Sequence, residues 1–183
     1  LVADMPFGTY QNVAVGVKNA IRLYKETGAD ALKIEVGASK IPLVAELVDN
    51  GIAIMAHIGL KPQFFRNEGY KVKGKSDDEK TALLNLALDL EKIGCFSVLM
   101  EGTKADIATK ITQSLKIPTI GIGSGNGTDG QILVWSDAFG FFNKFTPKFV
   151  RKYMDGENLL KEAIRRYVAD IKHCDFPNEN ESY

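Results

Sequence analysis

Residues 31–57 read ALKIEVGASKIPLVAELVDNGIAIMAH and decide the fold. A short apolar run occupies 31–35, and a second one occupies 52–57. Residues 41–49 lie between them with apolar side chains at helical spacing, and Asn50-Gly51 then gives a stop signal. Strand, helix and strand in this order predict a right-handed βαβ unit in a parallel sheet.

The same alternation continues on both sides of this unit. Further strands are expected at 1–4, 96–101 and 118–122, with a weak last one at Ala138-Phe139, and further helices at 12–26, 77–92, 104–115 and 157–172. We expect residues 1–183 to form a single domain with about six βα units and a C-terminal helix. A complete (β/α)8 TIM barrel takes roughly 250 residues, so this α/β chain fits a barrel that lacks its first two units. An open doubly wound sheet is the alternative that periodicity leaves open.

The composition argues against several classes of protein. Lys and Arg together number 23, as do Asp and Glu, so the chain has no net charge with which to attract nucleic acid or an anionic membrane. No apolar stretch approaches the roughly 18 residues of a membrane span. The two cysteines, Cys95 and Cys174, form no CxxC motif, which is typical of a reduced cytosolic protein. We therefore expect a soluble, cytoplasmic protein whose partner is a small molecule or another protein.

Polar side chains end four of the expected strands. Asp4 closes the first apolar run, Glu35 and His57 end the two runs of the quoted stretch, and Glu101 follows 96–100. The carboxyl ends of parallel strands meet at one rim, where barrels and open α/β sheets place their chemistry. We therefore expect an acidic site at this rim, with a titratable imidazole beside it.

Lys33 and Glu35 are two residues apart on one expected strand, so their side chains share a face. Alone, such a pair is typical of a structural salt bridge. Asp4 on the neighbouring strand changes this interpretation, because two converging carboxylates repel each other unless a cation lies between them, and oxygen ligands suit Mg²⁺. His57 alone is typical of a satisfied histidine near the core, whereas its expected place at a strand end gives a role in the site equal weight.

Glu101 follows an apolar run and precedes Gly102. We expect its carboxylate to emerge from an apolar wall onto a tight turn that leaves space for a substrate. This environment favours a general base. The alternative is a carboxylate that caps the next helix.

Two further patterns are weak. Residues 125–130, GNGTDG, formally satisfy GxGxxG after a strand, but no acidic residue ends a following strand about 20 residues later, so we do not expect a dinucleotide site. The glycines instead favour a tight loop whose backbone approaches the rim. The loop at 58–76 mixes basic and aromatic residues, and without a net basic field it is interpreted as an active-site loop or lid, or as a solvated face.

The most specific segment of the chain is IPTIGIGSGNGTDGQILV at 117–134. Shorter ones are ADMPF at 3–7, LKIE at 32–35, AHIGLKPQ at 56–63, GYKV at 69–72 and LME at 99–101. Together, and in this order, they resemble the ketopantoate hydroxymethyltransferase family. The resemblance implies a (β/α)8 barrel in a homo-oligomer, commonly a decamer. It also implies Mg²⁺-dependent transfer of a hydroxymethyl group from 5,10-methylenetetrahydrofolate to 3-methyl-2-oxobutanoate, in pantothenate synthesis.

The resemblance further implies roles for single residues. Asp4 matches a metal-binding aspartate that also contacts the substrate, and Glu35 matches a second acidic metal residue. Lys33 and His57 match substrate-binding residues, and Glu101 matches the catalytic proton acceptor.

The family's first two strands, in roughly 80 residues, are not in this sequence. They carry an Asp-Ser pair that supplies another metal ligand and a substrate contact, and we expect the native protein to contain them. Two other functions stay open at this point. One is that of another Mg²⁺-dependent lyase or aldolase acting on a 2-oxo acid in a related barrel, and the other is that of a non-catalytic fragment serving as an assembly module.

Overall fold

The computed structural model describes residues 1–142 and 144–183, and at 67 and 68 it describes the backbone alone. The chain forms two compact units, Leu1–Ile132 and Leu133–Tyr183. That they belong to a single domain stays a prediction.

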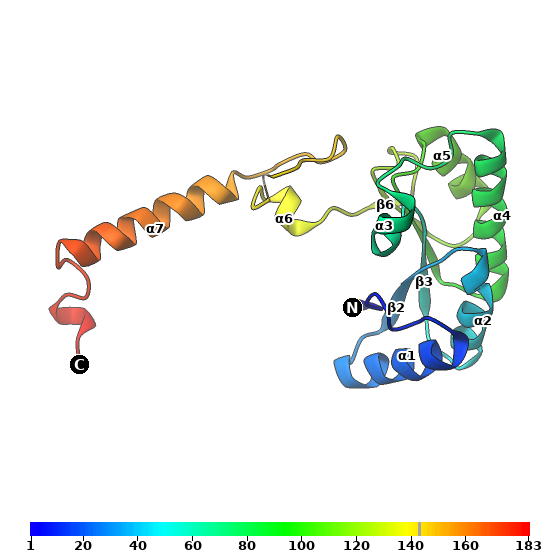
Figure 1. Ribbon diagram of the computed structural model, residues 1–183, viewed down its shortest axis with the longest axis horizontal. Coiled ribbons are helices and arrows are strands. Elements are labelled where there is room, and N and C mark those ends of the chain that lie inside the picture. Colours follow the sequence, from blue (N-terminus) through cyan, green and yellow to red (C-terminus); the bar gives the residue numbers. More distant parts are fainter. Residues whose placement is uncertain (143) are drawn as a thin grey trace. The chain divides into compact units, whose positions relative to one another are not determined.

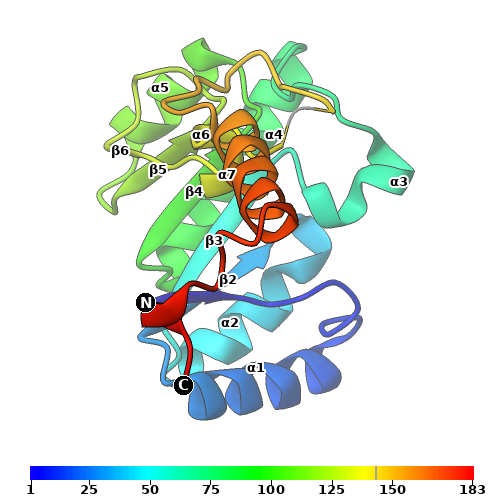
Figure 2. The same ribbon diagram turned by 90° about the vertical axis from the view of Figure 1, so that its left-hand side faces the viewer.

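The first unit contains one parallel sheet whose strands lie side by side in chain order. Its strands are β1 (Val2–Asp4), β2 (Ala31–Glu35), β3 (Ile54–Gly59), β4 (Ser97–Glu101), β5 (Thr119–Ile122) and β6 (Gly130–Gln131). All neighbouring strands pair in parallel, and β2 to β5 can be followed side by side in Figure 2. The predicted α/β class with a parallel sheet is confirmed.

Helices connect successive strands, as the alternation predicts. The long ones are α1 (Val13–Thr27), α2 (Ile41–Asp49), α4 (Asp77–Ile93) and α5 (Ala105–Ser114). Short turns of helix also occur in the connections: η1 (Ala38–Lys40), η2 (Pro62–Phe64) and α3 (Phe65–Glu68). The long helices lie along one side of the sheet (Figure 1).

Local signals explain where the helices begin and end. The side chain of Asn12 accepts the Val15 amide at the start of α1, and Gly28 ends this helix with φ +63°, a left-handed conformation that glycine adopts without strain. Ser76 caps α4 in the same way by accepting the amide of Glu79. These helices therefore begin and end within one residue of their predicted limits.

The hydrophobic core lies between the sheet and these helices. Its central side chains alternate along three strands and are fully buried: Leu32, Ile34, Ile54, Ala56, Ile58, Val98 and Met100. The register pairs them with one another across β2, β3 and β4, so all of them point to the helical side. The residues that alternate with them along these strands point to the opposite face of the sheet.

The second unit contains α6 (Trp135–Ala138), α7 (Gly156–Lys172) and η3 (Glu179–Glu181). The expected strand end at Ala138-Phe139 is wrong, because the amides of both residues bond to carbonyls four positions earlier and continue a helical turn. The terminal helix is confirmed, and its apolar side chains are exposed: Leu159, Leu160, Ile164, Tyr167, Val168 and Ile171. In the part of the chain that the structure describes, no helix combines the length and the apolar character that crossing a bilayer requires.

Candidate active site

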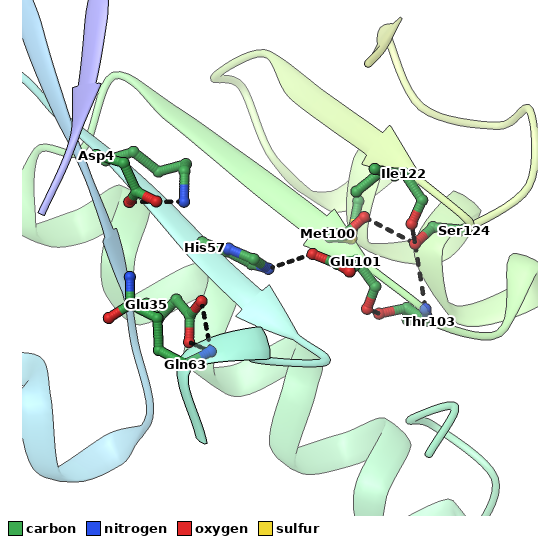
Figure 3. Close-up of polar contacts among 10 residues, drawn as sticks. Asp4, Glu35, His57, Gln63, Met100, Glu101, Thr103, Ile122 and Ser124 are labelled. Atoms are coloured by element: carbon green, nitrogen blue, oxygen red, sulfur yellow. Dashed lines mark hydrogen bonds and ion pairs between the residues drawn. The ribbon is translucent and has the colours of Figure 1, made fainter. Parts of the chain in front are cut away.

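The register of the sheet places all five predicted site residues on its other face. Asp4 is level with Lys33, and Glu35 is level with His57. Glu101 is level with the residue two positions after His57 on β3. Partners in neighbouring strands point to the same side, as do residues two apart on one strand. The side chains therefore leave the sheet on the face opposite the helical core, where Figure 3 shows those of Asp4, Glu35, His57 and Glu101.

His57 does not end its strand, contrary to expectation. β3 continues to Gly59, because pairing with β4 extends through the next two residues and places Gly59 opposite Glu101. His57 consequently lies inside the sheet, where it is only 3% exposed. Neither of its ring nitrogens has a hydrogen-bond partner in the described structure. Buried polar atoms of this kind are uncommon and call for an explanation, such as a ligand that supplies the partner.

Asp4 and Lys33 form an ion pair across β1 and β2. The ammonium nitrogen of Lys33 lies 2.7 Å from Oδ1 of Asp4. The side chain of Asp4 is about half exposed, so solvent weakens the pair and keeps its contribution to stability small. An anionic ligand bound beside Asp4 would therefore lie within reach of the Lys33 ammonium group.

Glu35 is a buried carboxylate, only 2% exposed, at the end of β2. Its two oxygens share the backbone amide of Gln63, at 3.2 and 3.1 Å. Burial raises the pKa of Glu35, and the charge of Asp4 acts in the same direction, whereas the Gln63 amide, His57 and Lys33 oppose the rise. A cation bound at Glu35 would relieve the cost of burying its negative charge.

Asp4 and Glu35 fit a magnesium ion better than a structural zinc ion. They are two carboxylates at neighbouring strand ends, and the charge of Asp4 helps to raise the pKa of Glu35. Among the side chains that the structure describes, no group of three or more His, Cys, Asp or Glu residues is placed to hold a metal. Mg²⁺ is commonly held by one or two carboxylates with water and substrate completing the shell, whereas structural zinc takes four protein ligands.

Glu101 faces His57 from the end of β4. Its Oε2 lies 3.4 Å from Nε2 of His57, and its side chain is mostly buried. Beside this pair the backbones of β3 and β4 lie so close that position 59 requires a glycine: its φ is +90°, and an added Cβ would lie 2.4 Å from the backbone carbonyl oxygen of Glu101. The alternative role of Glu101 as a helix cap is wrong, because Lys104 holds the N-cap position of α5.

A buried serine, Ser124, holds the turn that follows Glu101. It lies within the specific segment 117–134, but sequence analysis did not single it out. Oγ of Ser124 donates to the carbonyl of Met100 at 2.8 Å and accepts the amide of Thr103 at 3.2 Å (Figure 3). Oγ1 of Thr103 in turn donates to the carbonyl of Glu101 at 3.2 Å. The backbone on both sides of Glu101 is therefore tied to the loop after β5.

The glycines of that loop allow close packing against α5. A Cβ at Gly125 would lie 2.5 Å from Cβ of Ala105, and one at Gly127 would lie 2.0 Å from Oγ1 of Thr109. Only glycine fits at such separations. The expected tight loop is confirmed, and its backbone approaches the beginning of the helix that follows Glu101.

Comparison with known proteins assigns the family. The model of the family described as ketopantoate hydroxymethyltransferase matches residues 1–179. Proteins named 3-methyl-2-oxobutanoate hydroxymethyltransferase from Helicobacter hepaticus, Helicobacter pylori strain Shi470 and Campylobacter concisus are 55%, 53% and 50% identical to the chain over its whole length. The chain covers 70%, 68% and 68% of these relatives.

Among solved structures, an isomerase from Streptomyces coelicolor A3(2) has a TM-score of 0.46 at 13% identity, over 66% of this chain and 32% of that one. No residue role follows from a similarity at this level. The match to the family model and the identity to its members, in contrast, extend over almost the whole chain. The chain belongs to the ketopantoate hydroxymethyltransferase family.

Proposed function

We propose that this chain forms the larger part of a 3-methyl-2-oxobutanoate hydroxymethyltransferase, an enzyme of pantothenate synthesis. It would transfer a hydroxymethyl group from 5,10-methylenetetrahydrofolate to 3-methyl-2-oxobutanoate. The observation that carries the proposal is the identity of 50–55% to relatives of this name over the whole chain. The five side chains gathered on one face of the sheet supply the groups that the reaction needs.

Asp4 and Glu35 would hold Mg²⁺. Both are oxygen ligands at neighbouring strand ends, and burial makes the negative charge of Glu35 costly without a cation. When bound, the ion would polarise the keto group of a 2-oxo acid and stabilise negative charge on its oxygen.

Lys33 and His57 would bind the substrate. The Lys33 ammonium already pairs with one carboxylate, that of Asp4, and can attract the carboxylate of a 2-oxo acid beside it. The buried ring nitrogens of His57 would gain the hydrogen-bond partner that the protein does not give them. Together these contacts would orient the C3–H bond of the substrate toward Glu101.

Glu101 would act as the general base. Its carboxylate would take the proton from C3, the C–H bond pair would pass into the enolate, and C3 would then bond to the methylene carbon carried by the folate. Both bonds from this carbon to the folate nitrogens would break, water would supply the hydroxyl group, and the nitrogens would take up the C3 proton and one proton from water, which releases tetrahydrofolate. The backbone ties at Ser124 and Thr103 hold Glu101 in place, which supports the orientation that such a step requires.

We further propose that the complete protein is a (β/α)8 barrel whose first two units precede Leu1. The sheet has β1 and β6 at its two edges, so two more parallel strands between these edges would close an eight-stranded barrel. We also propose a homo-oligomer, such as the decamer, as membership of the family suggests. We expect the assembly to be cytoplasmic.

The test compares the chain with a chimera in which the preceding segment of the Helicobacter hepaticus relative is fused to Leu1. Both are assayed with Mg²⁺, 3-methyl-2-oxobutanoate and methylenetetrahydrofolate. We expect turnover in the chimera, and turnover in the chimera alone would also support the two added barrel units. Exchange of the C3 proton without folate-dependent product would favour a different lyase or aldolase, and no reaction in either protein would contradict the proposal.

A further inference from the structure

Gln63 connects the two carboxylates proposed to hold Mg²⁺. Its backbone amide donates to both oxygens of Glu35, at 3.2 and 3.1 Å (Figure 3). Its side-chain Nε2 donates to the carbonyl of Met5 at 2.9 Å, and Met5 directly follows Asp4. Gln63, in the connection that follows β3, therefore bonds both to the end of β2 and to the residue that follows β1.

The orientation of the Gln63 amide is fixed by its surroundings. The carbonyl of Met5 can only accept, so the NH₂ group must face it and Oε1 must face the other way. There Oε1 accepts the hydroxyl of Tyr10, which is buried. Burial raises the pKa of Tyr10, and the charges of Glu35 and Asp4 raise it further, so the hydroxyl keeps the proton that it donates.

Lys40 holds the backbone at Tyr10, whose hydroxyl bonds to Gln63. Its ammonium group donates to the carbonyls of Tyr10 and Gln11, at 2.8 and 3.1 Å. Lys40 closes η1, which follows β2, so the segment between β1 and α1 is held from β2 as well as from β3. The bonds that meet at Gln63 and Tyr10 thus add to the pairing of β1 with β2 in holding Asp4 relative to Glu35.

We propose that Gln63 is a positioning residue that sets the separation of Asp4 and Glu35 for Mg²⁺, with Tyr10 acting through it. This inference rests on the proposed function only in taking Mg²⁺ as the ion. Gln63 bonds to Glu35 through its backbone amide and to Met5 through its side chain. Without the side-chain bond, the end of β1 that carries Asp4 is no longer linked to the residue that holds Glu35, so the separation of the two carboxylates is less well fixed. Outer partners of this kind change metal affinity by about 10- to 100-fold when they are removed.

The experiment measures Mg²⁺ binding by titration calorimetry in the chimera described above, without substrate. Gln63→Leu removes the side-chain amide and keeps the backbone donor to Glu35. Tyr10→Phe removes one hydroxyl with little effect on packing, so it decides the question if Gln63→Leu fails to fold. Gln113→Leu makes the same change at an exposed position of α5 and is the matched control.

We expect Gln63→Leu to raise the Kd for Mg²⁺ by about tenfold and Tyr10→Phe to raise it by about threefold. The double variant should bind no more weakly than Gln63→Leu, because Tyr10 acts through Gln63. At saturating Mg²⁺, kcat of Gln63→Leu should stay within about threefold of the unmodified chimera, while Gln113→Leu should change neither quantity.

Unchanged Mg²⁺ affinity in folded Gln63→Leu, or in Tyr10→Phe where Gln63→Leu does not fold, would overturn the inference. Additive losses in the double variant would also overturn it, because Tyr10 would then act independently of Gln63. Failure of the unmodified chimera to bind Mg²⁺ would have the same consequence. If the chimera binds Mg²⁺ but does not transfer the hydroxymethyl group, the proposed function fails, while weaker binding in Gln63→Leu still supports the positioning role.

Discussion

Replacing Ser124 by alanine tests whether one buried hydroxyl holds the turn after Glu101. Ser124 is 1% exposed, and its oxygen bonds to the carbonyl of Met100 and to the amide of Thr103, which is also buried. Ser124→Ala removes both bonds without adding atoms. The amide of Thr103 is then left in a place that water reaches poorly.

The expected loss follows from these two bonds. A net hydrogen bond contributes about 1 kcal/mol, and a buried amide without a partner costs about 1–2 kcal/mol, so the free energy of unfolding should fall by about 2–3 kcal/mol. In a protein of this size the midpoint of thermal unfolding should fall by about 5–10 °C. Because Met100 and Thr103, on either side of Glu101, lose their bonds to Ser124, kcat should also fall by roughly tenfold or more.

Thermal unfolding followed by circular dichroism, together with the folate-dependent assay, measures both effects. Ser114→Ala is the matched control, since Ser114 donates to the carbonyl of Lys110 at an exposed site where water can replace it. Its midpoint should stay within about 2 °C of the unmodified protein. An equally small shift in Ser124→Ala, with unchanged kcat, would refute the role assigned to the serine.

Three other predictions concern single groups. Glu101→Gln should slow exchange of the C3 proton of 3-methyl-2-oxobutanoate, followed by NMR in D₂O, by about 100-fold or more and leave Mg²⁺ affinity unchanged; near-normal exchange would exclude Glu101 as the base. Asp129 accepts the amide and hydroxyl of Thr119, which lowers its pKa from 3.8. The ionised Asp129 carboxylate therefore stabilises the fold above the pKa that it has in the unfolded chain, and this contribution is lost as pH falls through its lower pKa in the folded protein. Between about pH 5 and about pH 2, the free energy of unfolding measured in urea should therefore fall less in Asp129→Asn than in the unmodified protein. Burial raises the pKa of Cys95 to about 12, so iodoacetamide at about pH 8 should label the exposed Cys174 and spare Cys95, and mass spectrometry showing equal labelling would contradict this.

The sequence predicts most elements of the first unit because their signals are local. The cap at Asn12, the stop at Gly28 and the apolar run of β2 each lie within a few residues of the feature that they determine. β6 gives no such signal, since it consists of Gly130 and Gln131 and exists only through pairing with β5. A strand defined by a distant partner cannot be found by periodicity, and the weak apolar pair at Ala138-Phe139 took its place in the prediction.

The contrast between local signals and distant partners also applies to the site, which contains side chains proposed to do the chemistry and residues proposed to position them. The side chains that would do the chemistry were predictable, because alternation along parallel strands puts Asp4, Lys33, Glu35, His57 and Glu101 on one face. This held for His57 even though its strand proved longer than expected, because lengthening a strand at its end does not change which face a residue occupies.

The residues that hold the site in place follow no such rule. Gln63 reaches Glu35 across 28 positions, and Ser124 reaches Met100 across 24. Gln63 lies in the single turn η2 and Ser124 in the loop after β5, and in neither place does a repeat fix the direction of a side chain. Both act through bonds that involve backbone groups, which every residue possesses. Nothing in their own neighbourhood therefore distinguishes them from other polar loop residues until the fold brings their partners close. In a parallel sheet the reacting groups can be inferred from periodicity, whereas the residues that position them become visible only in three dimensions.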